Sequence, residues 1–324
     1  MTNFPDRNEL IIHFAHSAYQ FSDRLAARNT GINAFQTWTP DNTAKRITEG
    51  HVLVVTGFWN NDFIETGGNL CFIQACGAGY NQFDLDALAT KGLRFANASG
   101  VNVNAVSDHA MALILGLMRK IHLARDNQHS KHWRGMIADI DRREDELAGK
   151  TMIIFGMGAI GSRVAHLAKA FEMNVIGVRR NVDAIRSLVD EAYAPGAFTS
   201  LLGRADFVLL TCPLTNETRN IIDHAALKLI RKDAYLINVA RGGCVDETAL
   251  IGALQTGEIA GAGIDTTVEE PLSTGSALWD ISNVILTPHT AGETQSYEEN
   301  VLDILLENLD RLWRGEGELY NQIV

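Results

Sequence analysis

A glycine-rich turn at residues 156–161 constrains the fold more than any other part of the sequence. Its letters are GMGAIG, after the apolar run TMIIFG and at the start of the helical pattern AIGSRVAHLAKAF. In a dinucleotide-binding strand–turn–helix unit the three glycines allow a tight turn, close approach to a pyrophosphate and close helix–strand packing. The helix N-terminus adds unpaired amides and a partial positive charge. We therefore expect this turn to bind a dinucleotide through Gly156, Gly158, Ala159, Ile160 and Gly161.

Short apolar runs alternate with helical patterns along the chain, which is typical of parallel sheets with crossover helices. Strands of a first unit are predicted at 9–14, 51–56, 70–75 and 93–98. Six strands of a second unit are predicted at 151–156, 174–178, 206–211, 234–240, 260–265 and 283–288. The predicted fold class is α/β, with two Rossmann-like doubly wound domains, one of them discontinuous, and the active site in the cleft between them.

The helical pattern at 293–314 must pack away from the sheet that it has just left, because it follows the last predicted strand. We expect it to return to the first unit. The predicted substrate domain is then 1–104 plus 290–324, the dinucleotide-binding domain is 105–289, and the crossings near 100–104 and 288–292 form a hinge. A buried apolar helix is predicted at about 104–124. The polar stretch 125–148 is expected to form an arm over a neighbouring subunit, or else a solvated excursion.

Charge and composition exclude several function classes. The net charge of −11 over 324 residues argues against a nucleic-acid or anionic-membrane partner. No apolar run approaches the roughly 18 residues that span a bilayer, and the N-terminus carries no signal-peptide pattern, so a cytoplasmic protein is expected. The four cysteines lack metal-ligand spacing, so we expect free, mostly buried thiols and no metal site.

Two arginines end the strand that follows the glycine-rich turn. An acidic residue at this point would accept hydrogen bonds from the ribose hydroxyls of NAD. Arg179 and Arg180 stand there instead, and a guanidinium can bind a phosphate through two parallel hydrogen bonds. The pair predicts NADP(H) as the preferred cofactor, with NAD(H) possible. The alternative is two solvated arginines beside a permissive NAD site.

Three later residues follow predicted strands and are expected to form a catalytic set: Arg241, Glu270 and His289. Ligands bind at the carboxyl ends of the strands in open α/β sheets. A histidine whose protonated form is stabilised by a carboxylate can protonate a carbonyl oxygen, while an arginine holds a substrate carboxylate. This set fits reduction of a 2-keto acid. Singly, the arginine could be a surface residue and the histidine a structural one. The adjacent Ser107, Asp108 and His109 face different directions on a helix, so no hydrolytic triad is expected.

Seven segments resemble the D-isomer-specific 2-hydroxyacid dehydrogenases over nearly the whole chain, and within them the branch of NADP-preferring glyoxylate/hydroxypyruvate reductases. They are GAGYNQFDLDAL (77–88), SGVNVNAVSDHAMALIL (99–115), LAGKTMIIFGMGAIG (147–161), LLTCPLTNETRNIID (209–223), INVARGGCVDETAL (237–250), GIDTTVEEPL (263–272) and LTPHTAG (286–292). Two departures from the family pattern are Asn81, where an acid is usual, and Asp108, where a glutamate is usual.

The resemblance implies a role for each matching residue. His289 is the proton donor paired with Glu270, Arg241 orients the substrate, and the amides of Ala78 and Gly79 bind its carboxylate. The implied cofactor contacts further include Cys212, Pro213, Thr218, Val239, Ala240, Asp265 and His289, with Cys212–Pro213 on the adenosine side and Asp265 at the nicotinamide amide. Family members commonly form homodimers in which the arm corresponding to 125–148 embraces the partner.

The expected activity is reduction of a small 2-keto acid such as glyoxylate or hydroxypyruvate to the D-2-hydroxy acid. Phe58 and Trp59 are candidates for the wall of the side-chain pocket, or else pack in the core. Phosphite oxidation on the same catalytic set stays an alternative, as does a non-catalytic nucleotide-sensing corepressor on the same fold. Formate oxidation is disfavoured, because that branch carries glutamine where Glu270 stands.

Overall fold

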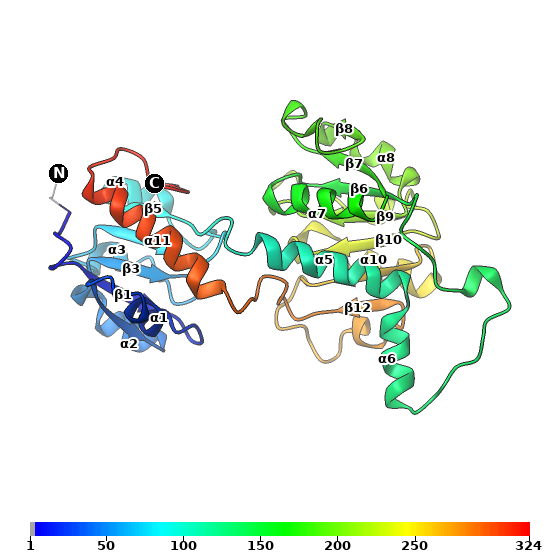
Figure 1. Ribbon diagram of the computed structural model, residues 1–324, viewed down its shortest axis with the longest axis horizontal. Helices are drawn as coiled ribbons and strands as arrows, with labels where there is room; N and C mark the ends of the chain where they lie inside the picture. The colour runs from blue at the N-terminus through cyan, green and yellow to red at the C-terminus, as the bar shows by residue number, and fades with distance from the viewer. Residues whose placement is uncertain (1–3) are drawn as a thin grey trace. The chain divides into compact units, whose positions relative to one another are not determined.

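Residues 4–324 are described by the computed structural model and divide into two units, each built around its own parallel sheet (Figure 1). The first unit contains the chain up to Asn102 together with Thr294–Val324, and the second contains Val103–Glu293. The chain therefore passes from one unit to the other twice. Both sheets are parallel throughout, so the fold is α/β with two Rossmann-like units, as predicted.

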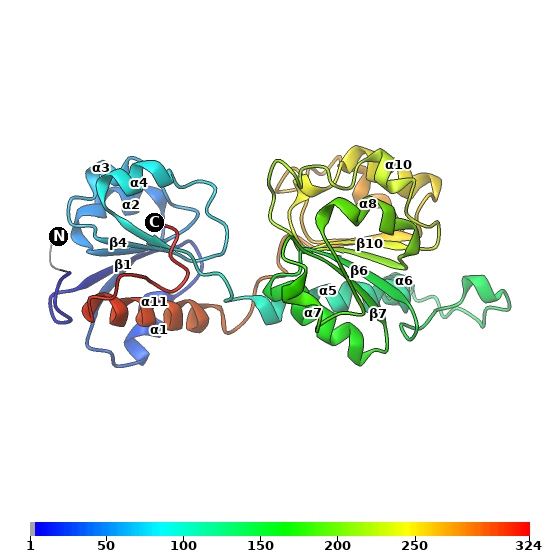
Figure 2. The same cartoon turned by 90° about the horizontal axis from the view of Figure 1, so that it is seen from above.

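The first unit has a five-stranded sheet in the order β2-β1-β3-β4-β5. Its strands are β1 (Ile11–Ala15), β2 (Asn33–Thr37), β3 (Val52–Val55), β4 (Phe72–Ala75) and β5 (Arg94–Ala96). Its helices are α1 (Phe21–Ala27), α2 (Pro40–Lys45), α3 (Phe63–Thr66), α4 (Leu85–Lys91) and α11 (Tyr297–Trp313). Helices α1 and α11 pack on one face of the sheet, and α3 and α4 on the other (Figure 2).

The second unit has a seven-stranded sheet in the order β12-β11-β10-β9-β6-β7-β8. Its strands are β6 (Thr151–Phe155), β7 (Asn174–Val178), β8 (Glu191–Tyr193), β9 (Phe207–Leu210), β10 (Tyr235–Asn238), β11 (Gly261–Ile264) and β12 (Val284–Leu286). Its helices are α5 (Val103–Met118), α6 (Ile121–His129), α7 (Ala159–Ala170), α8 (Phe198–Leu201), α9 (His224–Leu227) and α10 (Glu247–Thr256).

Two apolar layers cover this second sheet. Helices α5 and α7 pack on one face, whereas α8, α9 and α10 pack on the other (Figure 2). The chain order reverses where β6 lies between β7 and β9. At such a reversal the connections after two neighbouring strands run to opposite faces of the sheet, which leaves a crevice at the carboxyl ends of these strands. Open α/β sheets bind ligands in this crevice.

Two strands were not predicted from the sequence, and one helix was predicted with the wrong end. β2 and β8 are edge strands; β2 carries polar side chains, and β8 is three residues long with no buried position, so neither shows a clear apolar run. The predicted helix 104–124 ends at Met118, because Lys120 takes a left-handed backbone with φ of 51°. Helix α6 then begins at Ile121 and has no buried residue, so only α5 is the buried helix.

Among residues 4–324, none of the helices combines the length and apolarity needed to cross a membrane. All four cysteines are free thiols, and three of them are buried. Within the same residues, no three His, Cys, Asp or Glu side chains are grouped so as to hold a metal ion.

Candidate active site

The glycine-rich turn joins β6 to α7 at the switch point of the second sheet. A Cβ on Gly156, which has φ of 108°, would lie 2.6 Å from the backbone nitrogen of Cys212. A Cβ on Gly161 would lie 2.5 Å from the Gly156 carbonyl oxygen. Around Gly158, by contrast, a Cβ would meet no described atom within 4 Å, so this part of the turn is open.

Helix α7 begins at Ala159, followed by Ile160, and no side chain caps its N-terminus. The first amides of an α-helix have no partner within the helix, so they are available to an anion at the open turn. Thr211 supports the turn from β9, since its hydroxyl donates to the Gly156 carbonyl at 2.7 Å. The residues present therefore suit the pyrophosphate of a dinucleotide.

Arg179 lies against this turn. Its Nη1 donates to the carbonyl oxygen of Met157 at 2.9 Å, while its backbone nitrogen donates to Tyr193 of β8. Arg179 and Arg180 are both exposed. A hydrogen bond from Thr215, with a smaller contribution from the charge of Arg180, lowers the pKa of Glu217. The positive charge at the end of β7 thus faces a carboxylate from the loop after β9.

The loop after β9 contains Cys212, Pro213 and Thr218. The Thr218 hydroxyl donates to the Pro213 carbonyl at 2.7 Å and accepts from the Thr215 amide at 2.7 Å, which fixes the loop. The Cys212 Sγ lies 3.9 Å from the Sγ of Cys244. This contact and burial raise the pKa of Cys212, so its side chain is a neutral thiol.

His289 and Glu270 form a hydrogen-bonded pair. His289 Nδ1 lies 2.7 Å from Glu270 Oε2, and Glu270 Oε1 accepts from the Thr267 amide at 3.1 Å. A carboxylate accepts and does not donate, so Nδ1 carries a proton and Nε2 is left for a reacting group. Both side chains are partly exposed, at 43% and 38%. The pair has the composition and access of an acid–base centre.

Arg241 follows β10 and is exposed, after the buried Val239 and Ala240. Its Nη1 donates to the Ala240 carbonyl at 2.7 Å. The Asn238 side chain closes the turn, accepting from the Ala240 amide and donating to the Arg241 carbonyl, both at 3.1 Å. A guanidinium has five N–H donors, so several remain for a substrate carboxylate.

The loops that carry Arg241 and Glu270 are pressed together. A Cβ on Gly242 would lie 1.9 Å from the carbonyl oxygen of Thr267, and only glycine fits so close an approach. Thr267 also donates its amide to Glu270. The position of the arginine loop therefore depends on the position of the loop that holds the carboxylate.

Asp265 lies at the end of β11 and is only 2% exposed. Its Oδ1 accepts from the Thr287 hydroxyl at 2.6 Å and from the Thr290 amide at 3.0 Å, and its Oδ2 accepts from the Ala291 amide at 3.1 Å. Its backbone oxygen accepts from the His289 amide at 2.8 Å. The carboxylate thus organises the loop around His289.

In the first unit, Ala78 and Gly79 follow β4. Within residues 4–324 their amides donate to no protein acceptor, while the Ala78 carbonyl accepts from the Asn97 side chain at 2.8 Å. Both amides are therefore free for an anion. Trp59 stacks on Phe83 with ring centroids 4.7 Å apart. Phe58 and Trp59 are partly buried and pack against the core of this unit, which agrees with the core-packing interpretation.

In the second unit, the predicted residues all follow the carboxyl ends of strands in one parallel sheet, and these ends share an edge. Ser107, Asp108 and His109 bond to three separate partners, Ile160, Arg163 and Thr287, and form no triad. Thr211, Asn238 and Thr287 were not predicted from the sequence. Each is a hydrogen-bonding residue at or just after a strand end, which was the one available signal.

Residues 111–291, more than half of the chain, match the family described as "D-isomer specific 2-hydroxyacid dehydrogenase, NAD binding domain". The chain is 33% identical over 293 residues to a glyoxylate/hydroxypyruvate reductase B of Yersinia pseudotuberculosis serotype O:3, covering 88% of each protein. It is 34% identical over 291 residues to a D-3-phosphoglycerate dehydrogenase of Methanocaldococcus jannaschii; this match covers 86% of the chain and about half, 52%, of that relative.

A solved structure shares the fold over almost the whole chain. It is an acyclic imino acid reductase in complex with NADPH and D-Arg, with a TM-score of 0.82 and 25% identity, covering 97% of this chain and 100% of that one. The family match spans the glycine-rich turn, the arginine pair and the strand-end residues of the second unit described above. The chain therefore belongs to the D-isomer specific 2-hydroxyacid dehydrogenase family and is an oxidoreductase that uses a nicotinamide cofactor.

Proposed function

We propose that the protein is an NADP(H)-preferring reductase of a small 2-keto acid, of the glyoxylate or hydroxypyruvate type, and forms the D-2-hydroxy acid. The observation that carries this proposal is the 2.7 Å hydrogen bond between His289 and Glu270. It lies at the carboxyl ends of the strands in the same parallel sheet that positions Arg241 and the glycine-rich turn. The nicotinamide cofactor, when bound, supplies the hydride. The unit that contains Val103–Glu293 is proposed as the dinucleotide-binding domain, and the unit that contains Ala78 as the substrate domain.

His289 is the proposed proton donor. Its Nδ1–H is held by Glu270, so the imidazolium form places its second proton on Nε2, from which a carbonyl oxygen can take it. The Glu270 carboxylate is itself fixed by the Thr267 amide, which keeps the imidazole ring in one orientation. Asp265 fixes the backbone of the same loop. The residues around His289 thus fix both its tautomer and its direction.

Arg241 and the amides of Ala78 and Gly79 are the proposed carboxylate ligands. The guanidinium keeps most of its donors after its bond to Ala240, and a planar fork matches the two oxygens of a carboxylate. The two amides supply uncharged donors. Recognition of the acid group by this set favours substrates whose carboxylate is adjacent to the carbonyl that is reduced.

The arginine pair supports NADP(H). The guanidinium of Arg179 donates to the Met157 carbonyl in the glycine-rich turn. It therefore lies close to the N-terminus of α7 with its unpaired amides. A phosphate monoester carries about −1.5 to −2 charges near neutral pH. Arg180 offers a second positive charge, although Glu217 faces it. The further cofactor ligands in this proposal are Cys212, Pro213, Thr218, Val239, Ala240 and Asp265.

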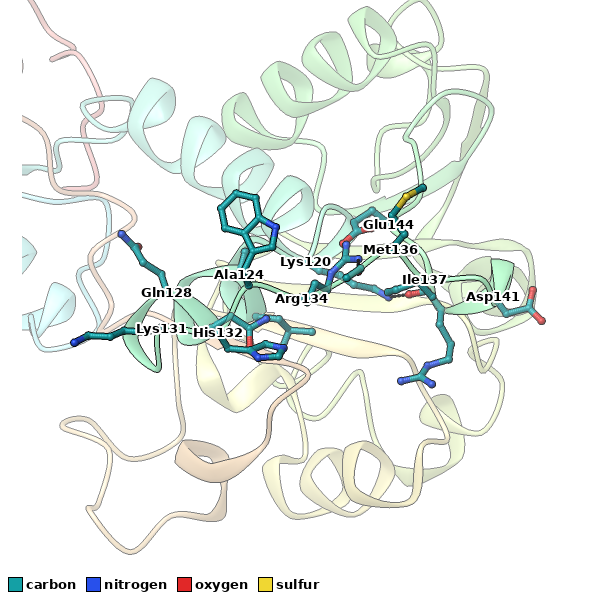
Figure 3. Close-up of a pocket in the computed structure, with 15 residues that line it drawn as sticks. Lys120, Ala124, Gln128, Lys131, His132, Arg134, Met136, Ile137, Asp141 and Glu144 are labelled. Carbon is teal, nitrogen blue, oxygen red and sulfur yellow. Dashed lines mark hydrogen bonds and ion pairs between the residues drawn. The ribbon is translucent and has the colours of Figure 1, made fainter.

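The surface of residues 120–144, which overlaps the predicted arm at 125–148, favours a homodimer. It borders a hollow of about 980 Å³, lined among others by Lys120, Met136 and Glu144 (Figure 3). Trp133, Met136 and Ile140 are 97%, 102% and 73% exposed. Contiguous patches of exposed apolar side chains mark interaction sites, and these three residues follow one another closely in one segment. We propose that a second copy of the chain covers this arm, in which case replacing Trp133 and Met136 by serine yields monomers in sedimentation velocity.

The cellular location proposed is the cytoplasm, a reducing compartment that suits four free thiols. A panel of 2-keto acids assayed with NADPH and with NADH tests the activity, with phosphite oxidation as a separate arm. The expected result is rapid oxidation of NADPH with glyoxylate or hydroxypyruvate, and formation of the D enantiomer from hydroxypyruvate, since the glycolate formed from glyoxylate is achiral. Turnover of phosphite with no turnover of any 2-keto acid would overturn the proposal.

A further inference from the structure

A chain of hydrogen bonds connects helix α5 to the loop that carries His289. His109 on α5 has its Nε2 2.9 Å from the Thr287 hydroxyl, which lies 2.6 Å from Oδ1 of Asp265. The Asp265 carboxylate accepts from the amides of Thr290 and Ala291, the two residues directly after His289. The series of hydrogen bonds therefore ends on the backbone directly after the proposed proton donor.

The direction of these hydrogen bonds follows from the number of protons available. An ionised carboxylate accepts only, so the Thr287 hydroxyl donates to Asp265. A hydroxyl has a single proton, and with that proton committed Thr287 must accept from His109. The geometry therefore requires a proton on Nε2 of His109, which leaves Nδ1 without one in the neutral ring.

His289 needs such support because its backbone is in an unfavourable conformation. Its φ of 54° lies in the left-handed region, which residues other than glycine rarely adopt. Conformations of this kind persist where the surroundings hold them. Here the His289 amide donates to the carbonyls of Asp265 and Thr287, and the next two amides bind the Asp265 carboxylate. Freedom in Asp265 or Thr287 would let the imidazole turn away from Glu270.

We propose that His109 and Thr287 are positioning residues for His289. His109 donates to Thr287, Thr287 holds one oxygen of Asp265, and Asp265 holds the loop in which His289 faces Glu270. His109 touches neither substrate nor cofactor in this scheme. Its Nε2 also lies 3.6 Å from Oδ1 of Asp265, so both of its contacts lead to the same carboxylate. The inference rests on the proposed role of His289 as the proton donor.

Four variants test this role in the full-length enzyme with NADPH and glyoxylate. His109→Leu and Thr287→Val remove one link each, and kcat is expected to fall about 10- to 100-fold, the usual cost of small misplacement of a catalytic group. The KM for glyoxylate should stay within about threefold, because Arg241 is untouched. His109→Gln places an amide N–H near the position of Nε2 and should recover most of kcat. The double variant should lose less than the product of the two single losses, because both links act on Asp265.

A matched control is His51→Gln, directly before β3 in the first unit, which is also half-buried and whose Nδ1 accepts from the Ile11 amide, outside this set of hydrogen bonds. It should leave kcat unchanged. Equal losses of kcat in His109→Leu and His109→Gln would show that the N–H donor at this position has no effect on the rate. A loss in the double variant equal to the product of the single losses would show that the two links do not act together on Asp265. Either result overturns the proposal.

A second measurement needs neither activity nor a variant that folds. In the wild-type protein without cofactor, long-range proton–nitrogen NMR at pH 9, where a free imidazole is neutral, reports the tautomer of His109. The expected state is the Nε2–H tautomer, and an Nδ1–H tautomer overturns the proposal. If the tautomer is as expected while no 2-keto acid is reduced, the proposed function fails and the hydrogen-bond chain stands.

Discussion

His289 Nδ1 and Glu270 Oε2 lie 2.7 Å apart, and this pair defines which imidazole nitrogen is left for chemistry. Replacement of His289 by Asn removes the proposed proton donor. We expect the rate of 2-keto acid reduction to fall roughly 10²- to 10⁴-fold while NADPH binding changes little. Stopped-flow turnover and a fluorescence titration of NADPH measure the two quantities. His224→Asn, at the exposed start of α9, is the control and should stay active. An active His289→Asn enzyme contradicts the assignment.

Arg241 should matter chiefly through the substrate. Arg241→Ala leaves a carboxylate without its paired donors, at a cost of about 1.5–3 kcal/mol in transition-state stabilisation. Lysine keeps the charge but loses the planar fork, so Arg241→Lys should recover only part of kcat/KM. The control is Arg231→Ala, since Arg231 is bound to Asp233. Full activity with lysine would mean that fork geometry plays no part.

Arg179 and Arg180 should set the preference between the two cofactors. Loss of one charge-assisted contact costs about 1.5–3 kcal/mol, or roughly ten- to 150-fold in affinity. Arg179→Asp should therefore raise the dissociation constant of NADPH strongly. The new carboxylate can accept from ribose hydroxyls, so NADH binding should hold or improve. Arg180→Ala should act in the same direction but less. Isothermal titration of both cofactors measures these effects. Equal affinity of the wild type for both would refute the NADP(H) preference.

Glu217 offers a test of the same site in the opposite direction. Its carboxylate faces Arg180 and is held by Thr215. Glu217→Gln keeps the shape of the side chain and removes a negative charge near the proposed phosphate. NADPH should bind more tightly at low ionic strength, and the gain should shrink in salt. An unchanged NADPH affinity at every salt concentration would place the phosphate elsewhere.

His13 should make the stability of the protein depend on pH. It is fully buried in β1, and burial, together with the nearby charge of Arg46, lowers the pKa of His13 from its ordinary value near 6.5 to about 4. Because the folded-state value is the lower one, the unfolded chain binds more protons between pH 6.5 and 4. This contribution to stability is therefore complete above pH 6.5 and is lost as the pH falls through the window.

The expected loss is about 3.5 kcal/mol at most, since each pKa unit corresponds to about 1.4 kcal/mol. Urea unfolding of the wild type and of His13→Gln at pH 4 to 7.5 measures it. The difference in unfolding free energy between the two proteins should change across the window, because glutamine does not titrate. A constant difference would show that His13 has an ordinary pKa in the folded state.

The sequence predicted the parts of the fold that depend on local patterns. Strands such as Asn174–Val178 are short apolar runs, and the glycines of the turn at 156–161, between a strand and a helix pattern, have the spacing that a dinucleotide-binding unit requires. Edge strands β2 and β8 were missed because partial exposure removes the apolar run that marks a buried strand.

The candidate site was predictable as far as its residues follow strand ends. Arg241, Glu270 and His289 each do so, and a parallel sheet gathers such positions at one edge. The link between His109 and Thr287 was not predictable, because the two residues are 178 positions apart and meet only when α5 packs beside β12. Likewise, nothing in the run IIHFA shows that His13 is neutral; that follows from its complete burial.

The absent side chain of Gly242 has a consequence for how this enzyme can be altered. Because the Thr267 carbonyl would lie 1.9 Å from a Cβ there, the segments bearing Arg241 and Glu270 behave as one mechanical part. Lengthening either segment by a single residue would displace both Arg241, the proposed ligand of the substrate carboxylate, and Glu270 of the proposed acid–base pair. Attempts to enlarge the substrate range by grafting loops should therefore exchange 239–246 and 265–271 as a set, since a graft of one alone leaves its counterpart out of register.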